Sequence, residues 1–131
     1  MADATISLED RQAMYDTLAR YVWGMDTADI EGVVATFTPD GVVKDVTGKR
    51  WDAAAGGVRG FATHFLTRPN RRGGQHHVQH LFVEPADGGG YRVTSCKVGA
   101  GRIGRPIWSQ VMFPHAPGRR RQLPASSSHR S

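Results

Sequence analysis

Three histidines, His76, His77 and His80, lie within residues 75–83, a stretch whose Val, Leu and Phe residues are typical of a buried strand. A strand directs alternate side chains to opposite faces. The even-numbered residues from His76 to Phe82 should therefore share one face, and the odd-numbered residues the other. A histidine among apolar side chains needs a hydrogen-bonding partner. A carboxylate in that position would fix the tautomer of the imidazole, which is the arrangement that a general base requires.

Asp26 is the candidate carboxylate. Apolar residues at helical spacing predict a helix from Leu8 to Met25, and Ser7, followed three residues later by an aspartate, resembles the start of a capping box. Asp26 follows Val22 by four residues, so it extends the apolar stripe and should point its carboxylate toward the core. The alternative is that Asp26 only ends this helix or caps the next one.

The remaining pattern predicts an α+β fold in which about three N-terminal helices pack on a curved, mostly antiparallel sheet. Asp29 can cap a second helix, and Pro69 follows a third. The expected elements are helices at 30–37 and 58–66, a loop at 51–57, and strands at 42–46, 75–84, 91–98 and 107–113.

Length and composition favour one domain, which we place at residues 1–113 of the 131, with a basic tail at 114–131 that we expect to be disordered. Residues 1–87 contain nine basic and all twelve acidic residues, whereas residues 88–131 contain eight basic residues and no acidic one. We interpret Arg119–Arg121 as part of a solvated tail rather than a nucleic-acid-binding arm. Without a long apolar run or a signal-peptide pattern, we expect a cytoplasmic protein with no membrane partner.

Two possible cofactor patterns are rejected. His76 and His80 would be about 13 Å apart on an extended strand, which is too far for one metal ion. Residues 99–104 match GxGxxG, but Pro106 follows almost at once and no acidic residue lies downstream to bind a ribose. The only cysteine, Cys96, is interpreted as a buried strand residue. We therefore expect neither a metal nor an organic cofactor.

With these elements in order, residues 7–98 resemble the SnoaL-like branch of the NTF2-like superfamily. The resemblance depends on residues 20–26 (RYVWGMD), which close the first helix, residues 37–42 (FTPDGV), and residues 75–78 (QHHV). It implies a cone-shaped α+β barrel with a deep apolar pocket. It also implies a homodimer or homotrimer that pairs through its sheets.

Within this superfamily, scytalone dehydratase and hexachlorocyclohexane dehydrochlorinase place an aspartate at the end of the first helix against a histidine on a central strand. Carried over by position, the catalytic pair is Asp26 and His76, with His77 as the alternative if the strand register differs by one residue. Family members often have asparagine where this chain has His80, which puts the polarity of the pocket in question. The residues expected to bind substrate are Val22, Trp23, Trp51, Phe61 and His80.

The resemblance implies a cofactor-independent lyase or isomerase, of the dehydratase, dehydrochlorinase or cyclase type, acting on a small hydrophobic and cyclic molecule. An imidazole oriented by a carboxylate can remove a proton from carbon, and the same carboxylate stabilises the imidazolium that forms. The alternative is a noncatalytic ligand-binding or assembly module, in which the histidines are hydrogen-bonded core residues.

Overall fold

The structure, a computed structural model, describes residues 6–69, 74–100 and 107–113. The predicted α+β class is confirmed. The helices are α1 (Leu8–Asp26), α2 (Ile30–Ala35), a 3-10 turn η1 (Ala53–Ala55) and α3 (Gly57–Leu66). The strands are β1 (Val43–Lys44), β2 (Arg50–Trp51), β3 (Gln75–Ala86), β4 (Gly90–Ala100) and β5 (Ile107–Phe113).

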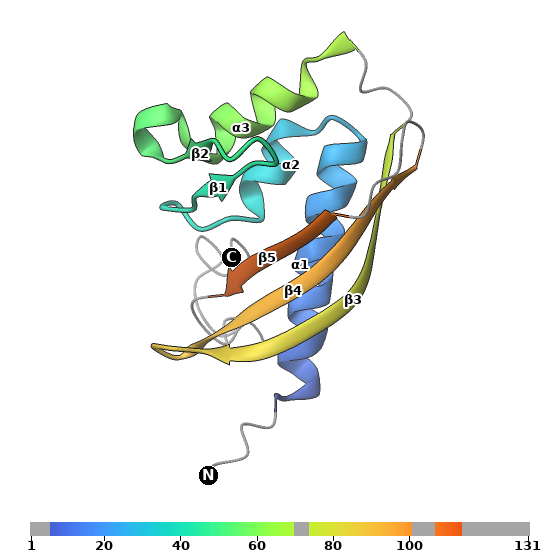
Figure 1. Cartoon of the computed structure of the whole chain (residues 1–131), viewed down its shortest axis with the longest axis vertical. Helices are drawn as coiled ribbons and strands as arrows, with labels where there is room; N and C mark the ends of the chain where they lie inside the picture. The colour runs from blue at the N-terminus through green and yellow to red at the C-terminus, as the bar shows by residue number, and fades with distance from the viewer. Residues whose placement is uncertain (1–5, 70–73, 101–106, 114–131) are drawn as a thin grey trace.

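The helices lie on one side of a curved three-stranded antiparallel sheet in the order β3-β4-β5 (Figure 1). The long helix α1 runs along this sheet, while α2 and α3 lie at one end of the molecule with the small β1-β2 sheet (Figure 1). Since α1 contacts both β3 and α2, it connects the sheet to the group of shorter helices.

The start of α1 follows the capping pattern seen in the sequence. The Ser7 hydroxyl accepts a hydrogen bond from the backbone N–H of Asp10 at 3.0 Å, which satisfies one donor of the first turn. Further along, Met14 and Leu18 are buried, and they pack with Val93 and other residues of the sheet. The helix ends at Asp26, one residue later than predicted.

A second apolar cluster joins the end of α1 to α2 and α3. Asp29 caps α2 as predicted, because its carboxylate accepts a hydrogen bond from the backbone N–H of Gly32 at 2.9 Å. The two helices approach closely at Gly24, where an added Cβ atom would lie 2.8 Å from Cγ2 of Val33. A glycine at this point of α1 therefore permits the turn into α2 without a steric clash.

The strand predicted at 42–46 is wrong in extent, because only Val43–Lys44 pairs, and it pairs with Arg50–Trp51 from the expected loop. Asp45 organises the turn between them. Its carboxylate accepts hydrogen bonds from the backbone N–H groups of Thr47 and Lys49, and from Nε1 of Trp51 at 2.8 Å. These side-chain contacts are not visible as a strand or helix period in the sequence.

The predicted assignment of faces in β3 is wrong beyond Gln79. Gln79 pairs with Cys96 and Phe82 pairs with Thr94, so His80 and Leu81 together oppose one residue of β4. This is a β-bulge, and His80 adopts a positive φ of 56° there. The extra residue shifts the alternation by one position. Leu81 and Val83, two positions further along the strand, therefore pack toward α1. Phe82, which lies between them, is 62% exposed.

The strand predicted at 107–113 is confirmed as β5, which pairs with β4. Cys96 is buried, as expected for a strand residue. The tail at 114–131, and most of the rejected GxGxxG stretch, lie outside the described residues. In the part of the chain that the structure describes, no helix combines the length and apolar character that a membrane crossing requires.

Candidate active site

Asp26 and His76 are in direct contact, although 50 residues separate them in the sequence. One carboxylate oxygen, Oδ1, lies 2.5 Å from Nδ1 of His76. The other, Oδ2, accepts a hydrogen bond from the backbone N–H of His76 at 2.9 Å. The carboxylate therefore holds both the ring and the main chain of this histidine at the start of β3.

This contact determines which nitrogen of the ring is basic. An ionised carboxylate only accepts hydrogen bonds, so Nδ1 of His76 must carry the proton that it shares with Asp26. In the neutral imidazole the other nitrogen, Nε2, then has the free electron pair. Asp26 thus sets the tautomer, as the sequence interpretation required of a carboxylate partner.

Both side chains of the pair remain accessible. The exposed fraction is 27% for the His76 side chain and 19% for that of Asp26. Within the described residues, Nε2 of His76 has no hydrogen-bonding partner. A nitrogen with a free electron pair at a half-buried position can accept a proton from a bound molecule.

The other residues predicted for the site are spread over the fold. Trp51 and Phe61 are almost fully buried in the apolar cluster between α1, α2 and α3, where their rings make an edge contact. Trp23 is 70% exposed and Val22 is half-buried on α1. His80 is exposed at the bulge of β3. The structure therefore brings Asp26 and His76 together, while the other five residues lie on α1, in the apolar cluster and at the bulge of β3.

His77 was the alternative base. Its side chain is exposed, and its backbone pairs with that of Val98 in β4. It alternates with His76 along the strand, so it points to the face turned away from α1. The register therefore places His76 rather than His77 against Asp26.

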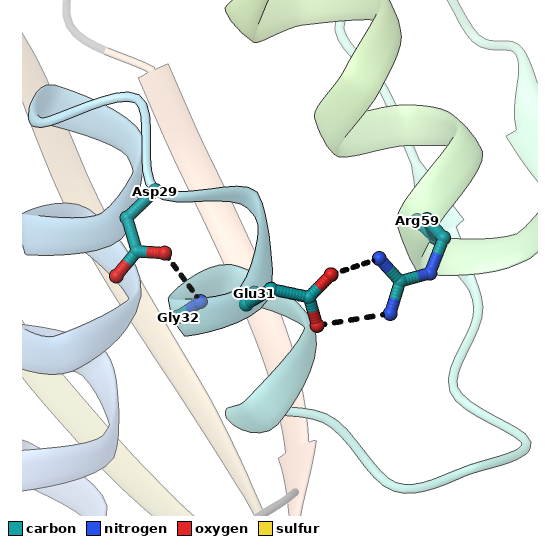
Figure 2. A network of polar contacts seen from close by, with 4 residues as sticks. All are labelled: Asp29, Glu31, Gly32 and Arg59. Carbon is teal, nitrogen blue, oxygen red and sulfur yellow. Dashed lines mark hydrogen bonds and ion pairs between the residues drawn. The ribbon is translucent and has the colours of Figure 1, made fainter.

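A surface hollow of about 800 Å³ lies beside α2 and α3, formed by residues between 31 and 42 and between 52 and 59. An ion pair between Glu31 and Arg59 borders it and joins the two helices, next to the Asp29 cap of α2 (Figure 2). The hydrogen bond from Arg59 lowers the pKa of the Glu31 carboxyl. None of the predicted site residues lines this hollow.

Lys97 is a half-buried titratable residue that the sequence interpretation did not select. Its side chain extends from β4 toward α1, and Nζ lies 4.7 Å from the centroid of the Tyr21 ring. Burial lowers the pKa of Lys97 to about 8. A sequence signal for its direction exists: Lys97 follows Ser95 by two residues and Val93 by four, and alternate residues of a strand share one face.

The comparisons with known proteins place the fold. The sequence matches the SnoaL-like domain over residues 7–112, which is most of the chain. The chain belongs to the SnoaL-like family. The match includes β5, so the SnoaL-like domain extends beyond residue 98, where the resemblance in the sequence ended. The search of curated proteins finds no match.

Several solved structures have a similar fold. A Nostoc punctiforme protein with a cystatin-like fold superposes with a TM-score of 0.61 at 18% identity, over 82% of this chain and 79% of that one. A proposed aromatic ring hydroxylase from Novosphingobium aromaticivorans gives 0.59 at 25%, over 83% and 79%. ActVI-ORFA from Streptomyces coelicolor gives 0.55 at 20%, over 78% and 81%. These similarities support the predicted NTF2-like α+β fold.

The described residues of this SnoaL-like domain contain no group of three or more His, Cys, Asp or Glu side chains that could hold a metal ion. Asp26 supplies a fixed negative charge, and His76 supplies one accessible nitrogen with a free electron pair.

Proposed function

We propose that this SnoaL-like domain is a cofactor-independent lyase or isomerase, of the dehydratase, dehydrochlorinase or cyclase type, in which His76 removes a proton from a substrate and Asp26 orients His76. The contact of 2.5 Å between Oδ1 of Asp26 and Nδ1 of His76 is the observation that carries this proposal. A core histidine that only needs a partner could use any acceptor. The double hold on ring and backbone fixes the ring in one orientation.

The proposed step uses only atoms of this pair and the substrate. The C–H bond of the substrate breaks, the proton moves to Nε2 of His76, and the electron pair stays on the substrate carbon. The ring becomes an imidazolium, which the Asp26 carboxylate stabilises across their hydrogen bond. A positioned base of this type typically contributes about 10² to 10⁴ in rate.

A small hydrophobic and cyclic molecule is the substrate class that we propose. Support comes from the surroundings of α1, where the half-buried residues Tyr21 and Val22 lie within two turns of Asp26. Tyr21 also packs against the cluster that contains Met25 and Phe37. An apolar environment excludes water and favours an uncharged ring over a charged metabolite.

Hydrogen–deuterium exchange tests the proposal without knowledge of the natural substrate. The probe is 2-tetralone, a small bicyclic ketone with acidic C–H bonds, incubated with the protein in D₂O and followed by NMR. We expect the wild type to accelerate exchange and His76→Gln to lose most of the acceleration. His77→Gln is the matched control, since this exposed neighbour faces away from Asp26, and it should keep the wild-type rate.

The proposal is overturned if His76→Gln, still folded by circular dichroism, exchanges the ketone as fast as the wild type. It is equally overturned if the wild type and His76→Gln both match the rate in buffer.

The second candidate is a noncatalytic ligand-binding module. The surface hollow beside α2 and α3 favours it, because this hollow of about 800 Å³ is not lined by Asp26 or His76. Under this proposal a bound apolar probe would perturb the NMR signals of residues 31–42 and 52–59. The signals of the Asp26–His76 pair would stay unchanged.

A further inference from the structure

Lys97 lies on the same interior face of the sheet as His76. In β4, Val93 and Ser95 are fully buried, and Val93 packs against Met14 and Leu18 of α1. Lys97 follows Ser95 by two residues, so its side chain leaves the same face of the strand. The contact of Nζ with the Tyr21 ring of α1 agrees with this direction.

The register of the sheet places Lys97 next to His76. His76 pairs with Gly99, and Val78 pairs with Lys97, so Lys97 is the diagonal neighbour of His76 across β3 and β4. The Cα atoms of diagonal neighbours on one face are typically about 7–8 Å apart. The residue directly opposite His76 is a glycine, so no side chain of β4 stands at that position.

The ammonium group of Lys97 lacks a counter-ion in the described part of the chain. No carboxylate there forms an ion pair with it, and the Tyr21 ring is the only partner found for Nζ among those residues. A cation over an aromatic ring recovers only part of the free energy lost on desolvation. A buried ammonium in this state would be stabilised further by an oxygen acceptor on a bound molecule.

We propose that Lys97 is a second catalytic residue, whose ammonium group binds the carbonyl oxygen of a substrate that His76 deprotonates at the adjacent carbon. This inference rests on the proposed function and names its substrate class, an enolisable ketone or a related carbonyl compound. The acidic carbon and the carbonyl oxygen of such a substrate are separated by two bonds, so one molecule could contact Nε2 of His76 and Nζ of Lys97 at about 3 Å each.

The step balances without any other reactant. The C–H bond breaks and its proton moves to Nε2 of His76. The electron pair forms a carbon–carbon double bond, and the carbonyl π electrons move to oxygen, giving an enolate. The hydrogen bond from the Lys97 ammonium stabilises the negative charge on that oxygen as it develops, which is the role of a donor in an oxyanion hole.

The first test is 2-tetralone exchange with Lys97→Met and Lys97→Arg. Methionine keeps most of the length and removes the charge, so we expect the exchange rate to fall by about 10²-fold, the typical cost of losing one oxyanion donor. Arginine keeps the charge and should restore part of the rate. A rate for Lys97→Met that equals the wild-type rate overturns the proposal.

The pH profile separates a catalytic role from a structural one. Because the pKa of Lys97 is lowered to about 8, the wild-type rate should decrease as the pH rises through 8, where the ammonium loses its proton. Lys97→Arg should not show this decrease. The described titratable groups that face Lys97 are Tyr21 on α1 and His76 on β3, and both are unchanged in this comparison. An identical alkaline decrease in Lys97→Arg would contradict the assignment.

Binding of 4-nitrophenolate distinguishes failure of this inference from failure of the proposed function. The phenolate resembles an enolate and needs no proton removal, so its affinity should fall about 10-fold in Lys97→Met and remain unchanged in His77→Gln. If the exchange rate depends on His76 but the affinity for phenolate is the same in Lys97→Met as in the wild type, the inference about Lys97 is wrong and the proposed function stands. If phenolate binding depends on Lys97 but exchange is absent, the proposed function is wrong and Lys97 is an anion-binding residue only.

Discussion

Asp26→Asn is the sharpest perturbation of the pair, because it replaces one carboxylate oxygen by an NH₂ group, removes the charge and changes almost no volume. The carboxylate accepts two hydrogen bonds, from Nδ1 and from the backbone N–H of His76. An asparagine amide offers one acceptor oxygen and one donor NH₂ group, so it cannot accept both. If the NH₂ group faces the ring, Nδ1 becomes the acceptor and the proton moves to Nε2.

The expected loss of activity follows from this change of tautomer. With a proton on Nε2, His76 cannot act as the base, and the imidazolium loses its neighbouring negative charge. We therefore expect the rate of 2-tetralone exchange to fall by about 10² to 10⁴, which is the whole contribution of a positioned base. The rate is measured by NMR in D₂O at one pH for wild type and variant.

The other orientation of the asparagine amide would reduce stability instead. If the oxygen stays with the ring, the backbone N–H of His76 faces a donor instead of an acceptor, and an unsatisfied donor costs about 1–3 kcal/mol. Urea unfolding followed by circular dichroism gives this value. The variant is expected to remain folded, since Asp26 lies at the end of α1 and is not part of either apolar cluster.

Asp29→Asn is the control. Asp29 is exposed and caps α2 through one hydrogen bond to Gly32, and asparagine caps helices about as well as aspartate. It should change neither the exchange rate nor the free energy of unfolding by more than about 0.5 kcal/mol. The reasoning is refuted if Asp26→Asn behaves like this control, or if its activity falls only in proportion to the fraction of unfolded protein.

Three further predictions concern stability. Gly24→Ala should destabilise the fold by about 1–3 kcal/mol, measured by urea unfolding, because the new methyl group meets Val33 at 2.8 Å; a neutral result would show that α1 and α2 can separate easily. Because burial lowers the pKa of Lys97 from 10.5 to about 8, the unfolded chain binds this proton more tightly. The free energy of unfolding should therefore rise between pH 8 and 10.5 by up to about 3 kcal/mol, and Lys97→Met, scanned over the same range, should lack this rise. The hydrogen bond from Thr47 lowers the pKa of Asp45 from 3.8 to about 2. The contribution of the Asp45 carboxylate to stability is therefore complete above pH 3.8 and is lost as the pH falls through 2. In denaturant titrations across this interval, the free energy of unfolding of Asp45→Asn should depend less on pH than that of the wild type.

Local signals in the sequence predict the helices, whereas the pairing of Asp26 with His76 came from the resemblance to the SnoaL-like branch. Ser7 and Asp29 predicted the starts of α1 and α2 because their side chains satisfy backbone donors nearby in the chain. Asp26 continues the apolar stripe of α1, and that periodicity favours a carboxylate turned toward the core, although the same position also fits a helix end or a cap. The role of the pair in catalysis stays a prediction.

The errors arose where one residue or a long-range contact decided the structure. The bulge at His80 adds a single residue, and nothing in the alternation of β3 distinguishes it from a regular strand. The two-residue strands β1 and β2 depend on hydrogen bonds to Asp45 rather than on a hydrophobic period. Trp51 and Phe61 lie in the apolar core, and their contact with a substrate stays a prediction, because apolar aromatic side chains fit either role equally well in the sequence.

The bulge in β3 also has a consequence for self-association. In the described sheet, β3 is an outer strand of 12 residues, with β4 on one side only. A long, straight outer strand presents unpaired backbone groups that can recruit the same strand of another molecule and start aggregation. His80 interrupts the regular spacing of these groups near the middle, and Pro85 removes one donor near the end. The β-bulge at His80, which made the predicted faces of β3 wrong, therefore also disfavours pairing of this outer strand with the same strand of another molecule.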